Sequence, residues 1–303
     1  MTMDITIRIG NSVFPNPVTV ASGTFGHAEE FYGQKEVRTL GALVPKTVTL
    51  EARQGNPPRR ICETPAGMIN AIGIENPGID AFIVDKLPKL KKTGVPVIVS
   101  ISAHSEDDFA VMAERLNAAG GLAAVELNLS CPNLQKKILV AQSAEATSAV
   151  VRRVKRVCAY PVIAKLSPNV TDIAAIALAA EAAGADAVSM VNTFAAMAID
   201  IKKRRSRIGN FTGGLSGPAI RPIAVRMVCE TFMKVKIPII GMGGITNAND
   251  ALEFLIAGAS MVAVGTYNFV DPRAPLNVLK GIKAYMKENR MTDIRELIGS
   301  VQR

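Results

Sequence analysis

The chain contains few of the residues that most often stack on nucleic-acid bases or bind metal ions. Its 303 residues include no tryptophan, 4 tyrosines and 10 phenylalanines, so base-stacking surfaces are scarce and single-stranded nucleic acid is not the expected ligand. Only 2 histidines occur, without an HExxH motif, which argues against a histidine-based zinc site. The 4 cysteines form no CxxC pair, which argues against an iron–sulfur cluster held by this chain. We therefore expect no metal site.

Long apolar runs and a secretory leader are also missing. No stretch approaches the ~20 apolar residues that a transmembrane helix needs. Without a leader, reduced thiols are the default state of the cysteines. We expect a cytoplasmic protein that does not enter a membrane.

Positive charge is in excess, and part of it is local. The formal net charge is +9 at pH 7, and basic residues cluster at 202–207 and 152–156. Each cluster is either a solvated face or a surface for an anionic substrate, an acidic partner or RNA, and the sequence leaves these alternatives open. The apolar fraction of 49% supports a sizeable core and excludes a wholly disordered chain.

Short apolar runs alternate with helical patterns along the chain. The predicted strands are 17–21, 42–48, 96–102, 123–129, 161–166, 187–192, 238–242 and 261–265. The predicted helices are 106–119, 171–184, 219–235, 247–257 and 272–299, with Gly258 as a C-cap. This alternation predicts an α/β protein with parallel strands and right-handed crossovers.

The alternation fits either a closed barrel or a doubly wound sheet. A dinucleotide-binding sheet needs GxGxxG after its first strand, but SGTFG follows at 22–26, and the later GMGGIT at 241–246 lacks the third glycine. Strand number and length favour a (β/α)8 TIM barrel, with 1–303 as a single domain. Residues 5–14 predict an N-terminal β-hairpin that caps the barrel bottom. Residues 50–80 and 194–218 predict long loops that form lids or substrate walls at the C-terminal face.

Polar and glycine residues follow nearly every predicted strand, and in a barrel these strand ends form the active site. Glycines after the last two strands, Gly243-Gly244 and Gly265, predict a phosphate site together with the helix that starts near Asn247. A sugar phosphate and a flavin mononucleotide (FMN) both fit. Burying the charges of Lys46 and Lys165 in the barrel mouth would be energetically costly without a bound anion. The scarcity of carboxylates argues against glycoside hydrolysis and a magnesium-dependent lyase.

A thiol follows the fourth predicted strand, in Asn128-Leu129-Ser130-Cys131-Pro132-Asn133. A cysteine at such a strand end acts as a base or nucleophile when its environment favours the thiolate. A buried cysteine is otherwise only a small apolar residue. The residues alone leave both interpretations of Cys131 open.

Longer motifs cover most of the chain, and with them it resembles the class 1 dihydroorotate dehydrogenases. The similar segments are ASGTFG at 21–26, KT at 46–47, GNPPR at 55–59, NAIGIENPG at 70–78, ELNLSCPN at 126–133, KLSPNVTDI at 165–173, VNT at 191–193, GGLSGPAIRPIA at 213–224 and IPIIGMGGITNANDALEFLIAGA at 237–259. TGGLSGPAI and IIGMGGI look most like the catalytic subunit of class 1B.

The resemblance implies a role for each matching residue. FMN would be held by Ser22, Lys46, Thr47, Ser100, Asn128, Lys165, Val191, Gly217, Gly243, Gly244, Gly265 and Thr266. Dihydroorotate would be held by Lys46, Asn70, Ala71, Ile72, Gly73, Ile74, Asn128, Asn133, Asn192 and Thr193. Cys131 would remove the proton from C5 while hydride leaves C6 for the flavin. The product would be orotate, in de novo pyrimidine (UMP) biosynthesis.

The resemblance also implies partners. In class 1B, electrons pass to NAD+ through a second subunit that carries FAD and a 2Fe-2S cluster, and a homodimer core joins two such subunits in a heterotetramer. Two departures stand out: Ser100 replaces an asparagine that is frequent in relatives, and Leu134–Val140 replaces a glycine-rich substrate lid. The alternatives are a dihydropyrimidine dehydrogenase-like enzyme acting on uracil or thymine, a basic RNA-binding or RNA-modifying barrel, and a non-catalytic FMN-binding scaffold.

Overall fold

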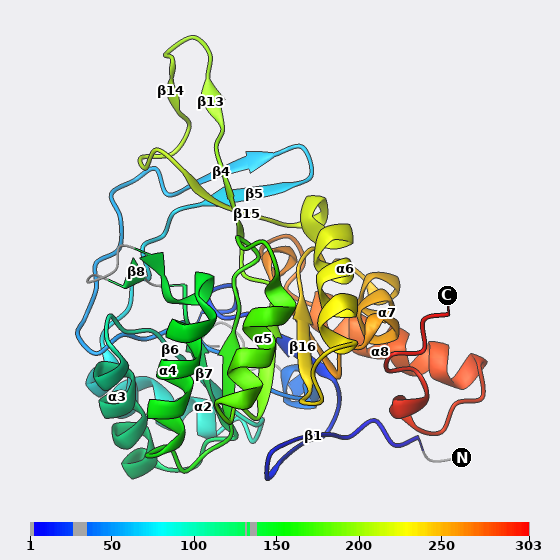
Figure 1. Ribbon diagram of the computed structural model, residues 1–303. Coiled ribbons are helices and arrows are strands. Elements are labelled where there is room, and N and C mark those ends of the chain that lie inside the picture. Colours follow the sequence, from blue (N-terminus) through cyan, green and yellow to red (C-terminus); the bar gives the residue numbers. More distant parts are fainter. Residues whose placement is uncertain (1–2, 27–34, 131, 134–137, 303) are drawn as a thin grey trace.

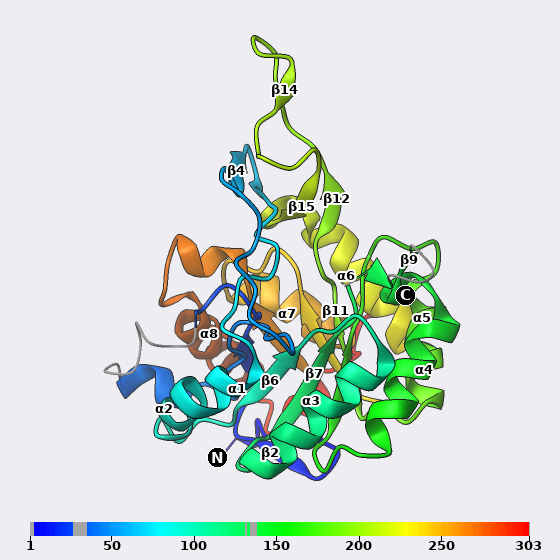
Figure 2. The same cartoon turned by 90° about the vertical axis from the view of Figure 1, so that its left-hand side faces the viewer.

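A curved parallel sheet forms the centre of the molecule (Figures 1 and 2). The computed structural model describes residues 3–26, 35–130, 132–133 and 138–302. Seven parallel strands pair in the order β3-β17-β16-β11-β10-β7-β6. They are β3 (Val18–Val20), β6 (Ile98–Ile101), β7 (Ala124–Asn128), β10 (Val162–Lys165), β11 (Ala187–Met190), β16 (Ile239–Met242) and β17 (Met261–Val264).

The eighth barrel position is held by an extended segment, 41–48, that makes only isolated bridges. Leu43 pairs with Val97 and Val48 with Ile101, both in parallel, next to β6. On the other side, the Gly41 amide donates to the Val18 carbonyl of β3 at 2.8 Å. Pro45 has no amide hydrogen, which interrupts a regular ladder. The predicted strand 42–48 is therefore not a regular strand, but its segment closes the predicted TIM barrel.

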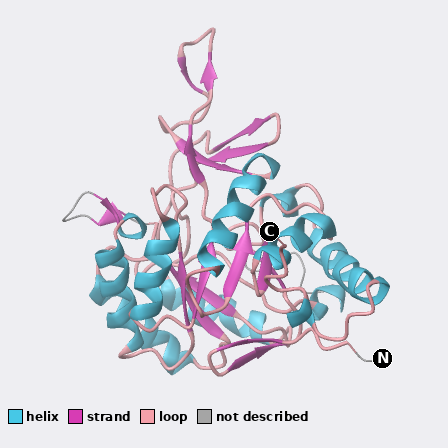
Figure 3. Cartoon of the chain, turned by 45° about the vertical axis from the view of Figure 1, so that its right-hand side comes forward, coloured by secondary structure: helices cyan, strands magenta, loops and turns pink. Residues whose placement is uncertain are grey.

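Helices surround the sheet and follow the predicted alternation (Figure 3). They are α1 (Ile79–Ala81), a π-helical turn (Phe82–Lys86), α2 (Leu87–Lys91), α3 (Glu106–Ala119), α4 (Ala144–Lys155), α5 (Ile173–Ala182), α6 (Arg221–Phe232), α7 (Ala248–Ala257) and α8 (Ala274–Glu288). Short 3-10 turns lie at Lys35–Thr39, Val140–Gln142, Pro218–Ile220, Thr266–Phe269 and Ile294–Glu296. Within these described ranges, no helix is both long and apolar enough to cross a membrane.

Local capping explains several helix boundaries. The Ser105 hydroxyl accepts a hydrogen bond from the Asp108 amide and starts α3, while Gly258 ends α7 in the left-handed region with φ 118°. The predicted helix 272–299 is too long. It ends at Glu288, Arg290 takes a positive φ of 57°, and Asp293 then caps a separate short turn.

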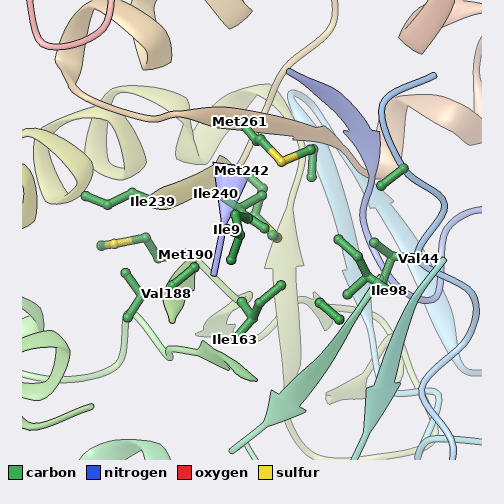
Figure 4. Packing of buried hydrophobic residues seen from close by; sticks show 14 of the residues in the cluster. Ile9, Val44, Ile98, Ile163, Val188, Met190, Ile239, Ile240, Met242 and Met261 are labelled. Carbon is green, nitrogen blue, oxygen red and sulfur yellow. The ribbon is translucent and has the colours of Figure 1, made fainter. Parts of the chain in front are cut away.

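The N-terminal hairpin closes the bottom of the barrel, as predicted. Strands β1 (Ile7–Ile9) and β2 (Ser12–Phe14) pair antiparallel. The Ser12 hydroxyl donates to the Ala123 carbonyl just before β7 at 2.6 Å. Figure 4 shows Ile9 in one cluster with strand residues such as Ile98, Ile163 and Met261. Buried on both faces, the central strands carry almost continuous apolar runs.

The two segments predicted as long loops pair with each other above the barrel mouth. Strands β4 (Ile61–Thr64), β5 (Gly67–Asn70), β12 (Phe194–Ala196) and β15 (Gly213–Ser216) form an antiparallel sheet, which we call the roof. Beyond it, β13 (Ile199–Asp200) and β14 (Arg205–Ser206) form an arm that projects from the body (Figures 1 and 2). A further short pair joins β8 (Pro132–Asn133) and β9 (Ile138–Leu139). The predicted walls thus exist, as strands rather than loops.

Candidate active site

A cavity of about 890 Å³ lies between the carboxyl ends of the barrel strands and the roof. This size is within the usual range for a ligand site. Its lining includes these predicted site residues: Ser22, Lys46, Thr47, Asn70, Ile72, Gly73, Ile74, Asn128, Lys165, Val191, Asn192, Thr193, Gly217, Gly243, Gly244, Gly265 and Thr266. Residues from segments more than 200 positions apart therefore converge on one cavity.

Two predicted site residues, Ala71 and Ser100, lie outside this lining, and the side chains of two others are not described. Cys131 lies outside the described residues, and Asn133 is described only as part of strand β8. Ala71 is absent from the cavity lining, and its carbonyl accepts from the Asn56 side chain at 3.0 Å. Ser100 is also absent from the lining and is fully buried behind Thr47.

A chain of hydroxyl groups supports one wall of the cavity. Ser22 Oγ donates to the Pro45 carbonyl at 2.9 Å and lies 2.8 Å from Thr47 Oγ1. Thr47 Oγ1 lies 2.9 Å from Ser100 Oγ. Ser100 therefore acts on the cavity through Thr47, because its own hydroxyl does not reach the lining.

A second wall carries a cluster of amides around Asn192. Its Nδ2 donates to Ser130 Oγ at 2.7 Å and lies 3.4 Å from Asn128 Oδ1. Its Oδ1 accepts from the Thr193 amide at 2.8 Å. Both ends of the Asn192 side chain are thus fixed, so its orientation is set before a ligand arrives. Ser130 was not predicted as a site residue, although it stands two positions after Asn128 at a strand end.

Two lysines bring positive charge into the cavity. Burial lowers the pKa of Lys46, the charge of Lys165 lowers it further, and Glu75 opposes both effects. Lys165 is only 5% exposed, and its Nζ lies 3.5 Å from Glu126 Oε1. Two cations in one partly enclosed space repel each other, so a bound anion would stabilise both.

Glu126 is the carboxylate that sequence reasoning did not assign. It stands within the apolar strand β7, and side-chain alternation puts it on the same face as Asn128. The two-residue spacing between Glu126 and Asn128 could have indicated that both side chains face the barrel interior. The surrounding apolar residues, however, suggested only a buried strand.

Glycine turns form the end of the cavity below the roof. A Cβ on Gly244, whose φ is 77°, would lie 2.8 Å from the Gly217 carbonyl oxygen, and a Cβ on Gly243 would lie 2.9 Å from Ala224. Nearby, Thr266 Oγ1 donates to Ser216 Oγ at 2.7 Å. Only glycines fit these turns. Because glycine has no side chain, the backbone amides of these turns can approach the cavity closely.

The start of α7 does not contribute in the predicted way. The Asn247 side chain accepts from the amides of Asn249 and Asp250. Asp250 is buried, accepts from the amide and hydroxyl of Thr246, and forms an ion pair with Arg221. The amides of Asn249 and Asp250 are therefore occupied, and Asn247 is not part of the cavity lining.

The two basic clusters lie away from the cavity. Residues 202–207 are on the arm, and the cavity lining contains none of them. On α4, Arg153 pairs with Asp107 and Lys155 with Asp186. These clusters are thus separate from the two lysines that line the cavity.

Fold and cavity together define an α/β-barrel enzyme whose site suits a large, anionic ligand rich in hydrogen-bonding groups. The chain matches the Dihydroorotate dehydrogenase family over residues 5–286. It is 51% identical to the dihydroorotate dehydrogenase B (NAD(+)) catalytic subunit of Desulforudis audaxviator, covering 100% of this chain and 99% of that protein. The corresponding subunits of Desulforamulus reducens and Caldicellulosiruptor bescii are 48% and 47% identical, each covering 99% of both chains. The chain therefore belongs to the dihydroorotate dehydrogenase family of oxidoreductases.

Proposed function

We propose that the chain oxidises (S)-dihydroorotate to orotate in pyrimidine (UMP) biosynthesis, with FMN as the hydride acceptor and residues 1–303 acting as one domain. The observation that carries this proposal is the convergence of Lys46, Asn128, Asn192 and the glycine turns on one cavity. Full-length relatives named for this activity support it.

The residues present fit FMN. The tight turns at Gly243 and Gly244, where a Cβ would collide with neighbouring atoms, leave backbone amides for a phosphate. Ser22, Thr47, Lys165, Val191, Gly217, Gly265 and Thr266 would complete the site. Bound FMN would supply acceptance of a hydride, and a nearby cation favours negative charge on its ring.

The amide wall and Lys46 fit the substrate. Dihydroorotate carries a carboxylate and ring amides, which pair with an ammonium and with asparagine side chains. The Asn70 side chain is fixed within the roof, because its Nδ2 donates to the Gly214 carbonyl at 3.2 Å. Lys46, Asn70, Asn128, Asn192 and Thr193 would therefore orient the ring, and 72–74 would border it. The dihydroorotate ring would therefore be oriented before its oxidation begins.

Cys131 is the proposed base for the C5 proton. This role comes from the matching NLSCPN motif, in which Cys131 stands three positions after Asn128 and directly after Ser130. A thiolate removes a proton effectively when nearby positive charge favours its ionised form. Lys46 and Lys165 line the same cavity as Asn128 and Ser130 and would provide such positive charge.

An anaerobic reduction experiment tests the function. Purified protein loaded with FMN is mixed with dihydroorotate, and flavin absorbance is followed. We expect rapid bleaching in the wild type and bleaching slower by roughly a hundredfold or more in Cys131→Ala. Dihydrouracil, which lacks the carboxylate, is the matched comparison and should react poorly. No bleaching by dihydroorotate would contradict the substrate, and equal rates in both proteins would remove Cys131 from the mechanism.

We further propose that the electrons reach NAD+ through a partner subunit carrying FAD and a 2Fe-2S cluster, in a heterotetramer built on a homodimer. The relatives are named as catalytic subunits of an NAD(+) enzyme, and the described residues hold no cluster of potential metal ligands. The chain alone should reduce an artificial dye with dihydroorotate but not NAD+. NAD+ reduction by the isolated chain would contradict the need for a partner.

A further inference from the structure

Glu126 is a buried carboxylate next to the cavity that the proposed reaction does not use. It is 2% exposed and stands on β7, opposite Ile163 of β10 and Ser100 of β6. Two positions further along the same strand, Asn128 reaches the cavity lining. Glu126 therefore lies one layer deeper in the barrel than the residues that would touch a ligand.

The two oxygens of Glu126 have different partners. Oε2 accepts a hydrogen bond from the Ser189 hydroxyl at 2.8 Å. Oε1 accepts no hydrogen bond from the described residues, and the nearest cation is Lys165 Nζ at 3.5 Å. Ionised carboxylates are rarely buried unless they are paired. The charge of Glu126 is therefore balanced mainly by Lys165.

Lys165 stands between this carboxylate and the cavity. It is buried in the barrel wall but belongs to the cavity lining. Its ammonium lies near Glu126, and the residue borders the cavity. The 3.5 Å separation is too long for a full hydrogen bond, so the ammonium remains able to turn toward a ligand.

We propose that Glu126 is a positioning residue that sets how much positive charge Lys165 presents to the ligand in the cavity. The inference rests on the proposed function to the extent that the ligand is FMN. By offsetting part of the ammonium charge, Glu126 limits the stabilisation of negative charge on the bound flavin ring. Glu126 would thereby lower the affinity of the holoprotein for electrons and for added anions.

Sulfite provides a direct test, because it combines reversibly with oxidised flavin and leaves additional negative charge on the ring. Glu126→Gln keeps the size of the side chain and an acceptor for Ser189 but removes the charge. We expect the sulfite Kd of the FMN-loaded protein, measured by absorbance, to fall about tenfold, because the positive charge of Lys165 is then no longer partly offset. An unchanged or increased Kd would overturn the proposal.

A double-mutant cycle tests whether the effect passes through Lys165. Lys165→Met alone should weaken sulfite binding, because the cation is lost. In that background Glu126→Gln should change the Kd by less than about twofold, because the ammonium through which Glu126 acts is absent. A tenfold gain that persists in the Lys165→Met protein would show that Glu126 acts directly on the ring and would overturn the positioning role.

Ser189→Ala provides a second variant with the opposite expected sign. It leaves the Glu126 charge in place but removes the Oε2 hydrogen bond, so the carboxylate should draw Lys165 more strongly and weaken sulfite binding a few-fold. An unchanged or tighter Kd would count against the proposal, even if Glu126→Gln failed to fold. A fall in thermal stability without a change in the sulfite Kd would indicate a purely structural role and would also overturn it.

The sulfite measurements separate this inference from the proposed function. They need bound FMN but no dihydroorotate. If Glu126→Gln changes the sulfite Kd as expected but dihydroorotate does not reduce the protein, the inference is supported and the proposed function is contradicted. If dihydroorotate reduces the protein but Glu126→Gln leaves the sulfite Kd unchanged, the proposed function is supported and the inference is contradicted. Failure to bind FMN would overturn both.

Discussion

Asn192 Nδ2 lies 2.7 Å from Ser130 Oγ, and this hydrogen bond fixes the amide that faces the proposed substrate site. Asn192 follows β11 and Ser130 follows β7, so the contact also joins two strand ends across the intervening β10. A free asparagine side chain would have to be ordered when a ligand binds. Here that ordering occurs on folding.

Removing the Ser130 hydroxyl should therefore weaken substrate recognition. We expect Ser130→Ala to lower kcat/KM for dihydroorotate by about fivefold to tenfold, the order of one hydrogen bond worth about 1 kcal/mol. Steady-state assays with a dye acceptor measure this change. Ser148→Ala on α4, far from the cavity lining, is the control and should leave kcat/KM unchanged. Equal kinetics in the two variants would show that Asn192 does not need this partner.

Lys46 should make stability depend on pH in a defined direction. Burial, assisted by the charge of Lys165, lowers the pKa of Lys46 in the folded protein below its ordinary value of 10.5. Between the lowered value and 10.5, the unfolded chain binds more protons than the folded chain, so the free energy of unfolding rises with pH there. At lower pH, both states are protonated and the full cost of burying the charge is present.

Urea unfolding of the protein without ligand at a series of alkaline pH values measures this slope. In Lys46→Met the contribution should disappear, so that stability rises less with pH in the interval below 10.5. Lys89→Met on α2 removes an exposed lysine and should keep the wild-type slope. A wild-type slope in Lys46→Met would mean that Lys46 is not the group responsible.

The position of most site residues followed from one rule, that polar side chains at the carboxyl ends of parallel strands meet. Asn128 and Lys165 are neighbours in the sheet register for this reason, and both line the cavity. The rule does not apply to residues below the strand ends. Glu126 and Ser100 lie in the deeper layer, where only the register of β6 and β7 shows which side chains they approach.

The roof was harder to foresee, because it depends on pairing between distant segments. Met68 of β5 pairs with Ser216 of β15, nearly 150 residues later, and each strand is short and rich in glycine or polar residues. Neither has the apolar alternation that identifies a strand. The barrel segment 41–48 shows the opposite case, in which the apolar pattern was recognised but Pro45 prevents a regular ladder.

Positive charge on the arm should be irrelevant to the chemistry of the cavity. Residues 202–207 are absent from its lining. We expect a variant with Lys202, Lys203, Arg204 and Arg205 replaced by glutamine to keep kcat/KM for dihydroorotate within about twofold of wild type in a dye-linked assay at low and at physiological salt. A large, salt-dependent loss would show instead that the arm attracts the anionic substrate.

The glycine turns provide a test that separates a strained backbone from a crowded cavity. Gly244 and Gly94 have similar positive φ values, 77° and 74°, so alanine at either position costs about 1 kcal/mol in backbone conformation. Only at Gly244 does the added Cβ also approach another atom, the Gly217 carbonyl oxygen at 2.8 Å, whereas nothing lies within 4 Å of a Cβ at Gly94. We expect both variants to lose thermal stability, but only Gly244→Ala to bind FMN more weakly, by tenfold or more for a loss of about 1.4 kcal/mol or more. Fluorescence titration of the apoprotein with FMN measures the Kd. Equal affinities in the two variants would place the FMN phosphate away from this turn.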